Sequence, residues 1–245
     1  MSLLEVRGLS KRFGGLQAVN GLDFAMAEGE MLGLIGPNGA GKTTVFNLLS
    51  GFIRPDAGDV RLRGRSVVGL PPHRICHLGL ARTFQIVRPF LRMSVLENVQ
   101  VGALARHPRA EEALERARAV VERVGLGPRA GIPAGALTLA ERKRLELARA
   151  LATEPALLLL DEVMAGLTAT ETATLVQLIG AIHRDGVSML LIEHNMRAVM
   201  ALSHRIVVLS FGEKIAEGAP AEVARNPKVV EAYLGEEHVG AAPAR

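Results

Sequence analysis

A glycine-rich stretch that ends in Lys-Thr constrains this chain more than any other feature of its sequence. Residues 36–43 read GPNGAGKT and match the pattern GxxxxGK[ST] at every fixed position. The stretch follows an apolar run, MLGLIG (31–36), and precedes an apolar segment that we expect to be helical. This order of strand, glycine-rich turn and helix is typical of a loop that binds phosphate groups. The alternative is an ordinary glycine-rich turn before a helix. It would not explain why every fixed position of GxxxxGK[ST] is matched with a strand before the pattern and a helix after it.

The residue types in this loop suit the phosphates of a nucleotide. Glycines accept positive φ angles and let backbone N–H groups approach phosphate oxygens, and the helix that follows points its positive dipole end at them. Lys42 supplies a point charge for the β- and γ-phosphates, and the Thr43 hydroxyl can bind Mg²⁺. The residues that we expect to contact the nucleotide here are Asn38, Gly39, Ala40, Gly41, Lys42, Thr43 and Thr44.

A pair of acidic residues follows a second apolar run, ALLLLDE (156–162). The leucines predict a buried strand that delivers Asp161 and Glu162 to its end. A charged pair that leaves an apolar strand needs a partner or a metal. We expect Asp161 to hold Mg²⁺ through water. Strand alternation points Glu162 to the opposite side, where it would orient or deprotonate a water that attacks the γ-phosphate. The alternative is a strand that simply ends at the surface.

Three further side chains are candidates with strong alternatives. Gln85 ends the stretch GLARTFQ (79–85), and its amide could reach the metal or the attacking water, although a lone glutamine is more often a surface residue. His194 ends the run VSMLLIEH and could hydrogen-bond the γ-phosphate, or merely flank Asn195 as a helix N-cap. Phe13, one of only seven phenylalanines, could stack on adenine or pack in the core.

Two segments carry the helix-capping pattern [S/T]-x-x-E. Thr138 with Glu141 begins the helix ERKRLELARALA, and Thr168 with Glu171 begins a helix that we expect to reach residue 184. A capped helix start with a hydroxyl is also an anion site. Spacing alone does not say whose phosphate Thr138 would bind.

The rest of the chain reads as α/β at both ends with a mainly helical middle. The expected strands are 3–7, 22–26, 31–36, an edge strand at 58–65, 156–162 and 187–194, followed by a hairpin around Phe211-Gly212. Between 72 and 154 the pattern is mostly helical, and a helix at 111–124 is expected to bury Leu114, Ala117, Val121 and Val124. Two short helices are expected after residue 218.

Composition excludes several classes of protein. Of the 245 residues, 49% are hydrophobic and 22% charged, which is typical of a folded chain with a sizeable core. A single cysteine permits no internal disulfide, and we expect neither a leader peptide nor a membrane-spanning helix. The net charge of +4 comes from scattered residues, and only 3% of residues are aromatic, so we expect no nucleic-acid surface.

Taken together, these motifs resemble those of the nucleotide-binding subunits of ABC transporters, over residues 4–235. GPNGAGKTT is similar to the Walker A motif, LLLLDE to the Walker B motif with its catalytic glutamate, TFQ to the Q-loop and IEH to the switch histidine. The stretches GLARTFQIVRPFLRMSVLENV, DEVMAGL, LIEHNMRAVM and NPKVVEAYLG are similar to the ATPases of branched-chain amino acid importers.

This resemblance implies a single ABC ATPase domain with the P-loop NTPase fold. Its mainly parallel core sheet and an N-terminal antiparallel β subdomain would occupy 1–85 and 155–235, a helical subdomain 86–154, and a flexible tail 236–245. The resemblance further implies ATP and Mg²⁺ as ligands, with Thr43, Gln85 and Asp161 at the metal. Glu162, His194 and Gln85 would be catalytic, and Phe13 would stack on adenine.

The implied partners are a second ATPase subunit, integral-membrane permease subunits and, indirectly, an extracytoplasmic substrate-binding protein. The chain would sit on the cytoplasmic face of the plasma (inner) membrane. In a head-to-tail dimer, Thr138 and Ala140 would face the ATP bound by the other subunit, and the segment after Gln85 would grip a helix of the permease. The dimer could be homomeric or heteromeric, and we favour the heteromeric form.

One departure from the family pattern concerns the signature LSGGQ, which here reads LTLAE (137–141). The hydroxyl of Thr138 is kept, but Leu139 and Ala140 replace two glycines and Glu141 replaces glutamine. Ala140 adds a Cβ where a phosphate would approach, and Glu141 adds a negative charge unless it folds back onto its own helix start. We still expect hydrolysis. The alternatives are a soluble ABC ATPase acting on ribosomes or nucleic acid, and a small-molecule kinase.

Overall fold

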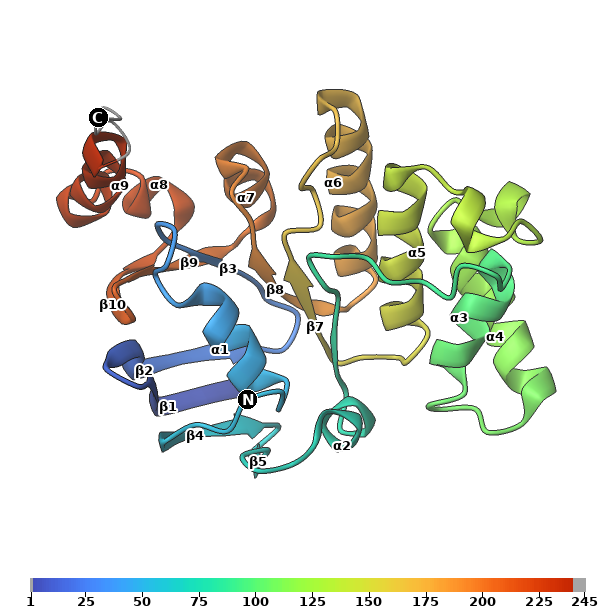
Figure 1. Ribbon diagram of the computed structural model, residues 1–245, viewed down its shortest axis with the longest axis horizontal. Helices are drawn as coiled ribbons and strands as arrows, with labels where there is room; N and C mark the ends of the chain where they lie inside the picture. Colours follow the sequence, from blue (N-terminus) through green and yellow to red (C-terminus); the bar gives the residue numbers. More distant parts are fainter. Residues whose placement is uncertain (1, 240–245) are drawn as a thin grey trace. The chain divides into compact units, whose positions relative to one another are not determined.

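The computed structural model describes residues 2–239, with side chains through residue 233. The chain divides into two compact units (Figure 1). The first unit comprises the chain up to Pro71 and from Leu190 onward, and the second comprises Pro72–Met189. The boundary at Leu190 falls inside strand β8 (Ser188–Ile192), all of whose residues are buried.

The first unit contains an antiparallel sheet with the strand order β2-β1-β4-β5. Its strands are β1 (Ser2–Phe13), β2 (Leu16–Ala27), β4 (Ala57–Leu62) and β5 (Arg65–Ser66). The strands predicted at 3–7 and 22–26 are parts of this much longer β1–β2 hairpin. The prediction that 58–65 is an edge strand was wrong, because β4 pairs with β1 on one side and with β5 on the other, so that β5 forms the edge.

The phosphate-loop pattern begins at the end of a second sheet in the same unit. Within this unit the order is β10-β9-β3-β8, with β3 (Met31–Ile35) parallel to β9 (Arg205–Ser210) and β10 (Glu213–Gly218) antiparallel to β9. All five residues of β3 are buried, as its apolar run predicts. The predicted hairpin is confirmed: Phe211 and Gly212 have φ angles of 47° and 81°, the left-handed pair that a two-residue hairpin turn requires.

The helices of the first unit are α1 (Lys42–Leu49), α7 (Met196–Leu202), α8 (Pro220–Val223) and α9 (Pro227–Val239). At 13 residues, α9 is longer than the short helix expected from the sequence. Its end at Val239 makes the first four residues of the predicted tail helical, and residues 240–245 lie outside the described part of the chain.

The second unit is mainly helical, as the sequence predicts. Its elements are α2 (Pro72–His77), β6 (Leu80–Arg82), α3 (Val95–Ala103), α4 (Ala110–Arg123), the 3₁₀ turns η1 (Gly127–Arg129) and η2 (Ala134–Ala136), α5 (Leu139–Leu151), β7 (Leu157–Asp161) and α6 (Ala169–Arg184). Strand β6 is parallel to β7, and α3 packs against both α4 and α5.

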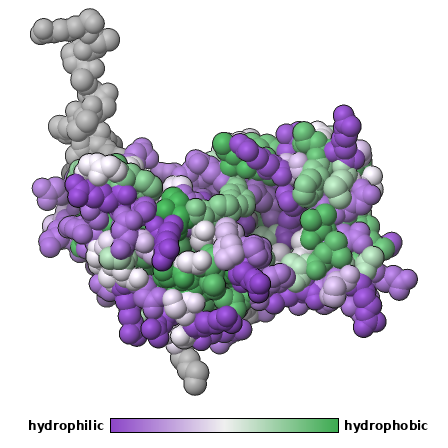
Figure 2. All heavy atoms as spheres, turned by 60° about the horizontal axis from the view of Figure 1, so that its bottom comes forward, coloured by the Kyte–Doolittle hydropathy of each residue, from purple (hydrophilic) through white to green (hydrophobic). Residues whose placement is uncertain are grey.

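The buried face of α4 differs in part from the prediction. Ala117 and Val121 are buried as expected, but Leu114 is only half-buried, and Ala113 takes its place in the core. The buried residues of α4 are small, namely Ala113, Ala117, Val120 and Val121, and small residues allow the close packing of this helix against α3. In the described part of the chain, no helix is long and apolar enough to cross a membrane. On the face shown in Figure 2, hydrophilic and hydrophobic side chains are intermingled.

Candidate functional site

The glycine-rich loop holds its lysine side chain in place. Lys42 is the first residue of α1 and only 6% exposed. Its Nζ donates hydrogen bonds to the backbone oxygens of Gly36 (2.6 Å) and Pro37 (2.8 Å). The ammonium group therefore lies inside the curve of the loop. No side chain caps the start of α1, and a helix start that lacks a side-chain cap is a place where an anion can bind.

Two glycines of the loop stand where any larger residue would collide with the backbone. Gly36 has φ 153°, and a Cβ built there would lie 2.1 Å from the backbone oxygen of Leu209. Gly41 has φ 101°, and its Cβ would lie 2.3 Å from the backbone oxygen of Ala18. The loop is thus wedged between β9 and β2, which explains why the pattern demands glycine at both positions.

The remaining predicted contacts of the first unit lie in or near this loop, with two exceptions. Asn38, Gly39 and Thr43 are exposed, and Thr44 is half-buried in α1. Phe13 lies at the end of β1 and is 45% exposed with Lys11 Nζ 5.6 Å from its ring centre, so it is not a core residue. His194 is exposed and lies two residues beyond the end of β8, just before α7. Asn195 caps α7 as predicted.

In the second unit, the carboxylate of Asp161 is buried at the end of β7 and paired with a cation. Arg82 Nη2 donates to Asp161 Oδ2 at 2.7 Å, and both side chains are less than a tenth exposed. A buried carboxylate of this kind needs a compensating charge, which Arg82 supplies. Arg82 is not among the site residues predicted from the sequence. Its signal was available, since it ends a strand three residues before the predicted Gln85.

Glu162 is positioned by a left-handed backbone turn and by Gln85. The strand ends at Asp161, and Glu162 has φ 46°, so the expectation that strand alternation sets its direction was wrong. The amide Nε2 of Gln85 donates to Glu162 Oε2 at 2.6 Å. The structure therefore brings two of the predicted catalytic residues together. This use of the amide N–H leaves the amide oxygen of Gln85 as the atom suited to a cation.

Two buried charged residues of α5 reach the same place and were missed by the sequence analysis. Lys143 Nζ donates to the backbone oxygens of Gln85 (3.1 Å) and Glu162 (3.2 Å). Glu146 Oε1 accepts from the backbone N–H of Phe84 at 2.6 Å. Burial, and to a smaller degree the charge of Asp161, raises the pKa of Glu146 above its ordinary value. Their i, i+3 spacing was the only signal in the sequence.

The start of α5 has the predicted capping box. Thr138 Oγ1 accepts from the N–H of Glu141 at 3.3 Å, and Glu141 Oε2 accepts from the N–H of Thr138 at 2.9 Å. Glu141 is thus folded back onto its own helix start, and the Thr138 N–H together with the Arg129 guanidinium holds its pKa below the ordinary value. The negative charge of Glu141 is therefore already compensated, so it opposes the approach of a phosphate less than the LTLAE signature alone would indicate. Thr168 and Glu171 form a second capping box at α6.

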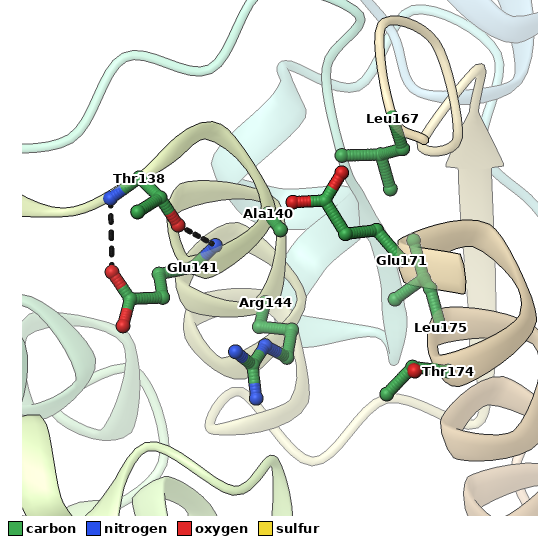
Figure 3. Close-up of a pocket in the computed structure, with 8 residues that line it drawn as sticks. All are labelled: Thr138, Ala140, Glu141, Arg144, Leu167, Glu171, Thr174 and Leu175. Carbon is green, nitrogen blue, oxygen red and sulfur yellow. Dashed lines mark hydrogen bonds between the residues drawn. The ribbon is translucent and has the colours of Figure 1, made fainter. Parts of the chain in front are cut away.

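A pocket of about 210 Å³ opens between the starts of α5 and α6 (Figure 3). Its lining comprises Thr138, Ala140, Glu141, Arg144, Leu167, Glu171, Thr174 and Leu175. In Figure 3 the methyl group of Ala140 faces the side of the pocket formed by Leu167 and Glu171. Of the residues predicted at the nucleotide of another subunit, both Thr138 and Ala140 line this pocket.

The donor set predicted for Mg²⁺ is chemically suitable. It consists of a threonine hydroxyl (Thr43), a carboxylate (Asp161) and an amide oxygen (Gln85), and oxygen ligands are what this cation prefers. Asp161 lies at the end of β7, and the Gln85 amide lies beside Glu162. Among the described residues, no three His, Cys, Asp or Glu side chains cluster as a metal site. This does not bear on Mg²⁺, for which only one carboxylate is predicted.

Comparison of the sequence with protein families gives two matches. The family described as "ABC transporter" matches residues 19–165, and the family described as "Branched-chain amino acid ATP-binding cassette transporter" matches residues 213–239. The first match contains the glycine-rich loop, Gln85, Asp161 and Glu162.

Several curated relatives are similar over nearly their whole length. The chain is 46% identical to the high-affinity branched-chain amino acid transport ATP-binding protein LivG of Salmonella typhimurium, over 96% of this chain and 98% of that protein. It is 45% identical to the corresponding BraF protein of Pseudomonas aeruginosa, with the same coverage. A probable branched-chain amino acid transport ATP-binding protein LivG of Archaeoglobus fulgidus is 36% identical over 96% of each chain.

Solved structures share the fold. An ATP-binding cassette crystallised without nucleotide has a TM-score of 0.86 and 29% identity, covering 95% of this chain and 99% of its own. The ADP conformation of the cassette MJ1267 has a TM-score of 0.87 and 29% identity, covering 96% of this chain and 99% of its own. The expected fold class is thereby confirmed. It consists of an antiparallel N-terminal sheet, a mixed and mostly parallel core sheet, and a helical subdomain.

Proposed function

Because this chain belongs to the ABC transporter family of ATP-binding proteins, we propose that it is the ATP-hydrolysing subunit of an importer of branched-chain amino acids. The observation that carries this proposal is the 45–46% identity, over 96% of the chain, to ATP-binding proteins of high-affinity branched-chain amino acid transport. The match of residues 213–239 to a family specific for that transport supports the same branch.

The residues of the first unit supply nucleotide binding. The backbone N–H groups of Asn38, Gly39, Ala40 and Gly41 and the start of α1 bind phosphate oxygens, and Lys42 neutralises the β- and γ-phosphates. Lys42 already lies within the loop, so it exchanges backbone oxygens for phosphate oxygens without a large change of position. Thr44 adds a hydroxyl, and the exposed ring of Phe13 stacks on adenine. His194 donates a hydrogen bond to the γ-phosphate.

The residues of the second unit supply the chemistry of water attack. Glu162 accepts a proton from the water, or orients it, as that water attacks the γ-phosphorus and the bond to ADP breaks. Gln85 holds the Glu162 carboxylate by the 2.6 Å hydrogen bond. Thr43, Asp161 and the amide oxygen of Gln85 would hold Mg²⁺, which neutralises charge on the phosphates.

Thr138 and Ala140 contact the nucleotide of a second ATPase subunit in a head-to-tail dimer. The capping box supports this role because it orders the first turn of α5, from which Thr138 and Ala140 line the pocket. Separate membrane permease subunits carry the amino acid across the membrane, since the described part of this chain has no helix that could span it. We place the chain on the cytoplasmic face of that membrane, paired with a related ATPase.

Affinity purification of this chain from native membranes in mild detergent, followed by mass spectrometry, tests the proposal. We expect two multi-spanning permeases and a second, similar ATPase to accompany it, and the associated binding protein to select branched-chain amino acids. Ribosomal or DNA-associated partners without any membrane protein would overturn the transport role and favour a soluble ABC ATPase. A phosphorylated small molecule formed from ATP would instead indicate a kinase.

A further inference from the structure

One face of α5 carries charged side chains at every third residue: Lys143, Glu146 and Arg149. Side chains three residues apart lie on the same side of a helix. All three contact the stretch that follows β6, residues 84–91, which we call the Gln85 segment. The contacts lie wholly within the second unit.

Lys143 links the backbones of the two residues whose side chains meet. Its Nζ donates to the backbone oxygen of Gln85 at 3.1 Å and to that of Glu162 at 3.2 Å. The side chain is only 4% exposed, and a buried ammonium group is stable only when acceptors surround it. A single cation therefore sets the separation between the Gln85 segment and the turn that carries Glu162.

Glu146 holds the neighbouring residue of the same segment. Its Oε1 accepts the N–H of Phe84 at 2.6 Å, and the residue is 7% exposed. Within the described part of the chain, its buried Oε2 has no hydrogen-bond partner. Keeping a partly unsatisfied carboxyl group in the interior costs stability, so its presence calls for a gain elsewhere.

Arg149 extends the row along the segment. Its Nη1 donates to the backbone oxygen of Arg88 at 3.1 Å, and its guanidinium lies 5.0 Å from the centre of the Phe90 ring. The row thus contacts the segment at its beginning and near its end. The outer side of the segment is apolar and exposed: Phe84 is 42% exposed, Ile86 66% and Leu91 56%.

We propose that Lys143, Glu146 and Arg149 are positioning residues: they hold the Gln85 segment in register with Glu162 and so keep the Gln85 amide aligned with the Glu162 carboxylate during hydrolysis. The proposal rests on the proposed catalytic role of Glu162. If the row served only to satisfy the backbone polar groups of a loop, its removal would lower stability but would not act on turnover through Gln85.

Turnover by the full-length protein tests the proposal through Lys143. In Lys143→Met we expect kcat for ATP hydrolysis to fall about tenfold or more while KM for ATP stays within about twofold, because the loss affects water attack and not nucleotide binding. Lys143→Arg can still donate to both backbone oxygens and should restore most of the rate. Arg118→Met removes an exposed cation from α4 and is the matched control. A parental kcat in Lys143→Met would overturn the proposal.

A double variant separates positioning from general damage to the fold. If Lys143 acts through Gln85, then Lys143→Met combined with Gln85→Ala should be no slower than the slower single variant. Multiplied losses would overturn the proposal.

Amide hydrogen exchange is a readout independent of turnover. In Lys143→Met we expect faster exchange at residues 84–91, with exchange in α4 unchanged. Unchanged exchange at 84–91 would contradict the proposed positioning role of Lys143. A parent protein that hydrolyses no ATP would contradict the proposed function itself, whereas the exchange result would still report on the contacts.

Discussion

The side-chain amide of Gln85 donates a 2.6 Å hydrogen bond to the carboxylate of Glu162, a residue 77 positions away in the chain. This contact orders a carboxylate that stands in a left-handed turn at the end of a buried strand. A general base must hold its carboxylate in a fixed direction toward the water from which it takes a proton. The hydrogen bond from Gln85 fixes the Glu162 carboxylate in the way that its proposed role as a base requires.

Removing the carboxylate charge should separate ATP binding from hydrolysis. In Glu162→Gln we expect ATP to bind with unchanged affinity and turnover to fall by about 10²–10⁴-fold, which is the range that a general base contributes. Steady-state phosphate release and nucleotide binding, measured on the same preparation, check this. Glu115→Gln, an exposed change on α4, should behave as the parent. Unchanged turnover would remove Glu162 from its assigned role.

Removing the hydrogen-bond donor should act on the same step. In Gln85→Ala the Glu162 carboxylate loses its partner, so we expect slower turnover with ATP binding retained. Because the two residues act as a unit, Gln85→Ala combined with Glu162→Gln should be no slower than Glu162→Gln alone. Single-turnover hydrolysis of the three variants measures this. Losses that multiply would contradict the prediction and would mean that Gln85 contributes independently of Glu162, as its proposed place at Mg²⁺ would allow.

A bulky cation at the start of α5 should block hydrolysis that depends on a second subunit. We expect Thr138→Arg to abolish turnover without weakening ATP binding by the monomer, because Thr138 is assigned to the nucleotide of the other subunit. Thr138→Ser keeps both the hydroxyl and the helix cap and is the control. Normal hydrolysis by Thr138→Arg would argue against a shared site.

The buried carboxyl group of Glu146 should give stability a distinctive pH dependence. Burial raises its pKa in the folded protein above the ordinary value of 4.5, so the folded state holds this proton to higher pH than the unfolded chain does. The free energy of unfolding must therefore fall as pH rises from 4.5 to the folded pKa. Glu146→Gln has no such proton and keeps an acceptor for the Phe84 N–H. We expect it to lack this fall and to be at least as stable as the parent near neutral pH.

Denaturant unfolding at a series of pH values, from below the ordinary pKa of a glutamate to neutrality, measures this difference. Glu115→Gln, in which an exposed carboxyl group is replaced, should retain the parental pH profile. A parallel shift of the whole profile in Glu146→Gln, without a change of slope, would contradict the prediction.

Two glycines of the phosphate loop should differ in their tolerance of alanine. Both have positive φ, but a Cβ at Gly36 would lie 2.1 Å from the Leu209 backbone oxygen, whereas Gly39 has nothing within 4 Å. We expect Gly39→Ala to lower the free energy of unfolding by about 1–2 kcal/mol, from backbone strain alone. Gly36→Ala should lower it by about 3 kcal/mol or more, because the backbone of β9 must also move. Equal losses would contradict the predicted steric difference.

Much of the fold was predictable because it follows from local patterns. The buried strands β3, β7 and β8 are short apolar runs, the hairpin at Phe211-Gly212 follows from turn chemistry, and both capping boxes were found from four-residue spacing. One error concerns strand pairing. The strand at 58–65 was expected at an edge but lies inside its sheet, because the neighbour on its far side is the two-residue strand β5, too short to give a pattern.

The candidate site divides in the same way. The sequence by itself indicated the phosphate loop, and it indicated Asp161 and Glu162 as candidate site residues at the end of a strand. Both follow from local patterns, because loop, strand and helix follow one another within a few residues and each has its own residue pattern. Only the tertiary structure decided what those side chains contact. The decisive contacts join residues far apart in the chain. Arg82 pairs with Asp161, Gln85 donates to Glu162, and Lys143 donates to the backbone oxygens of Gln85 and Glu162. Burial of β7 and α5 removes water from these charged groups, so each group needs a hydrogen-bond or ion-pair partner within the protein. Tertiary packing determines which segment supplies that partner, and no local pattern of residues specifies it.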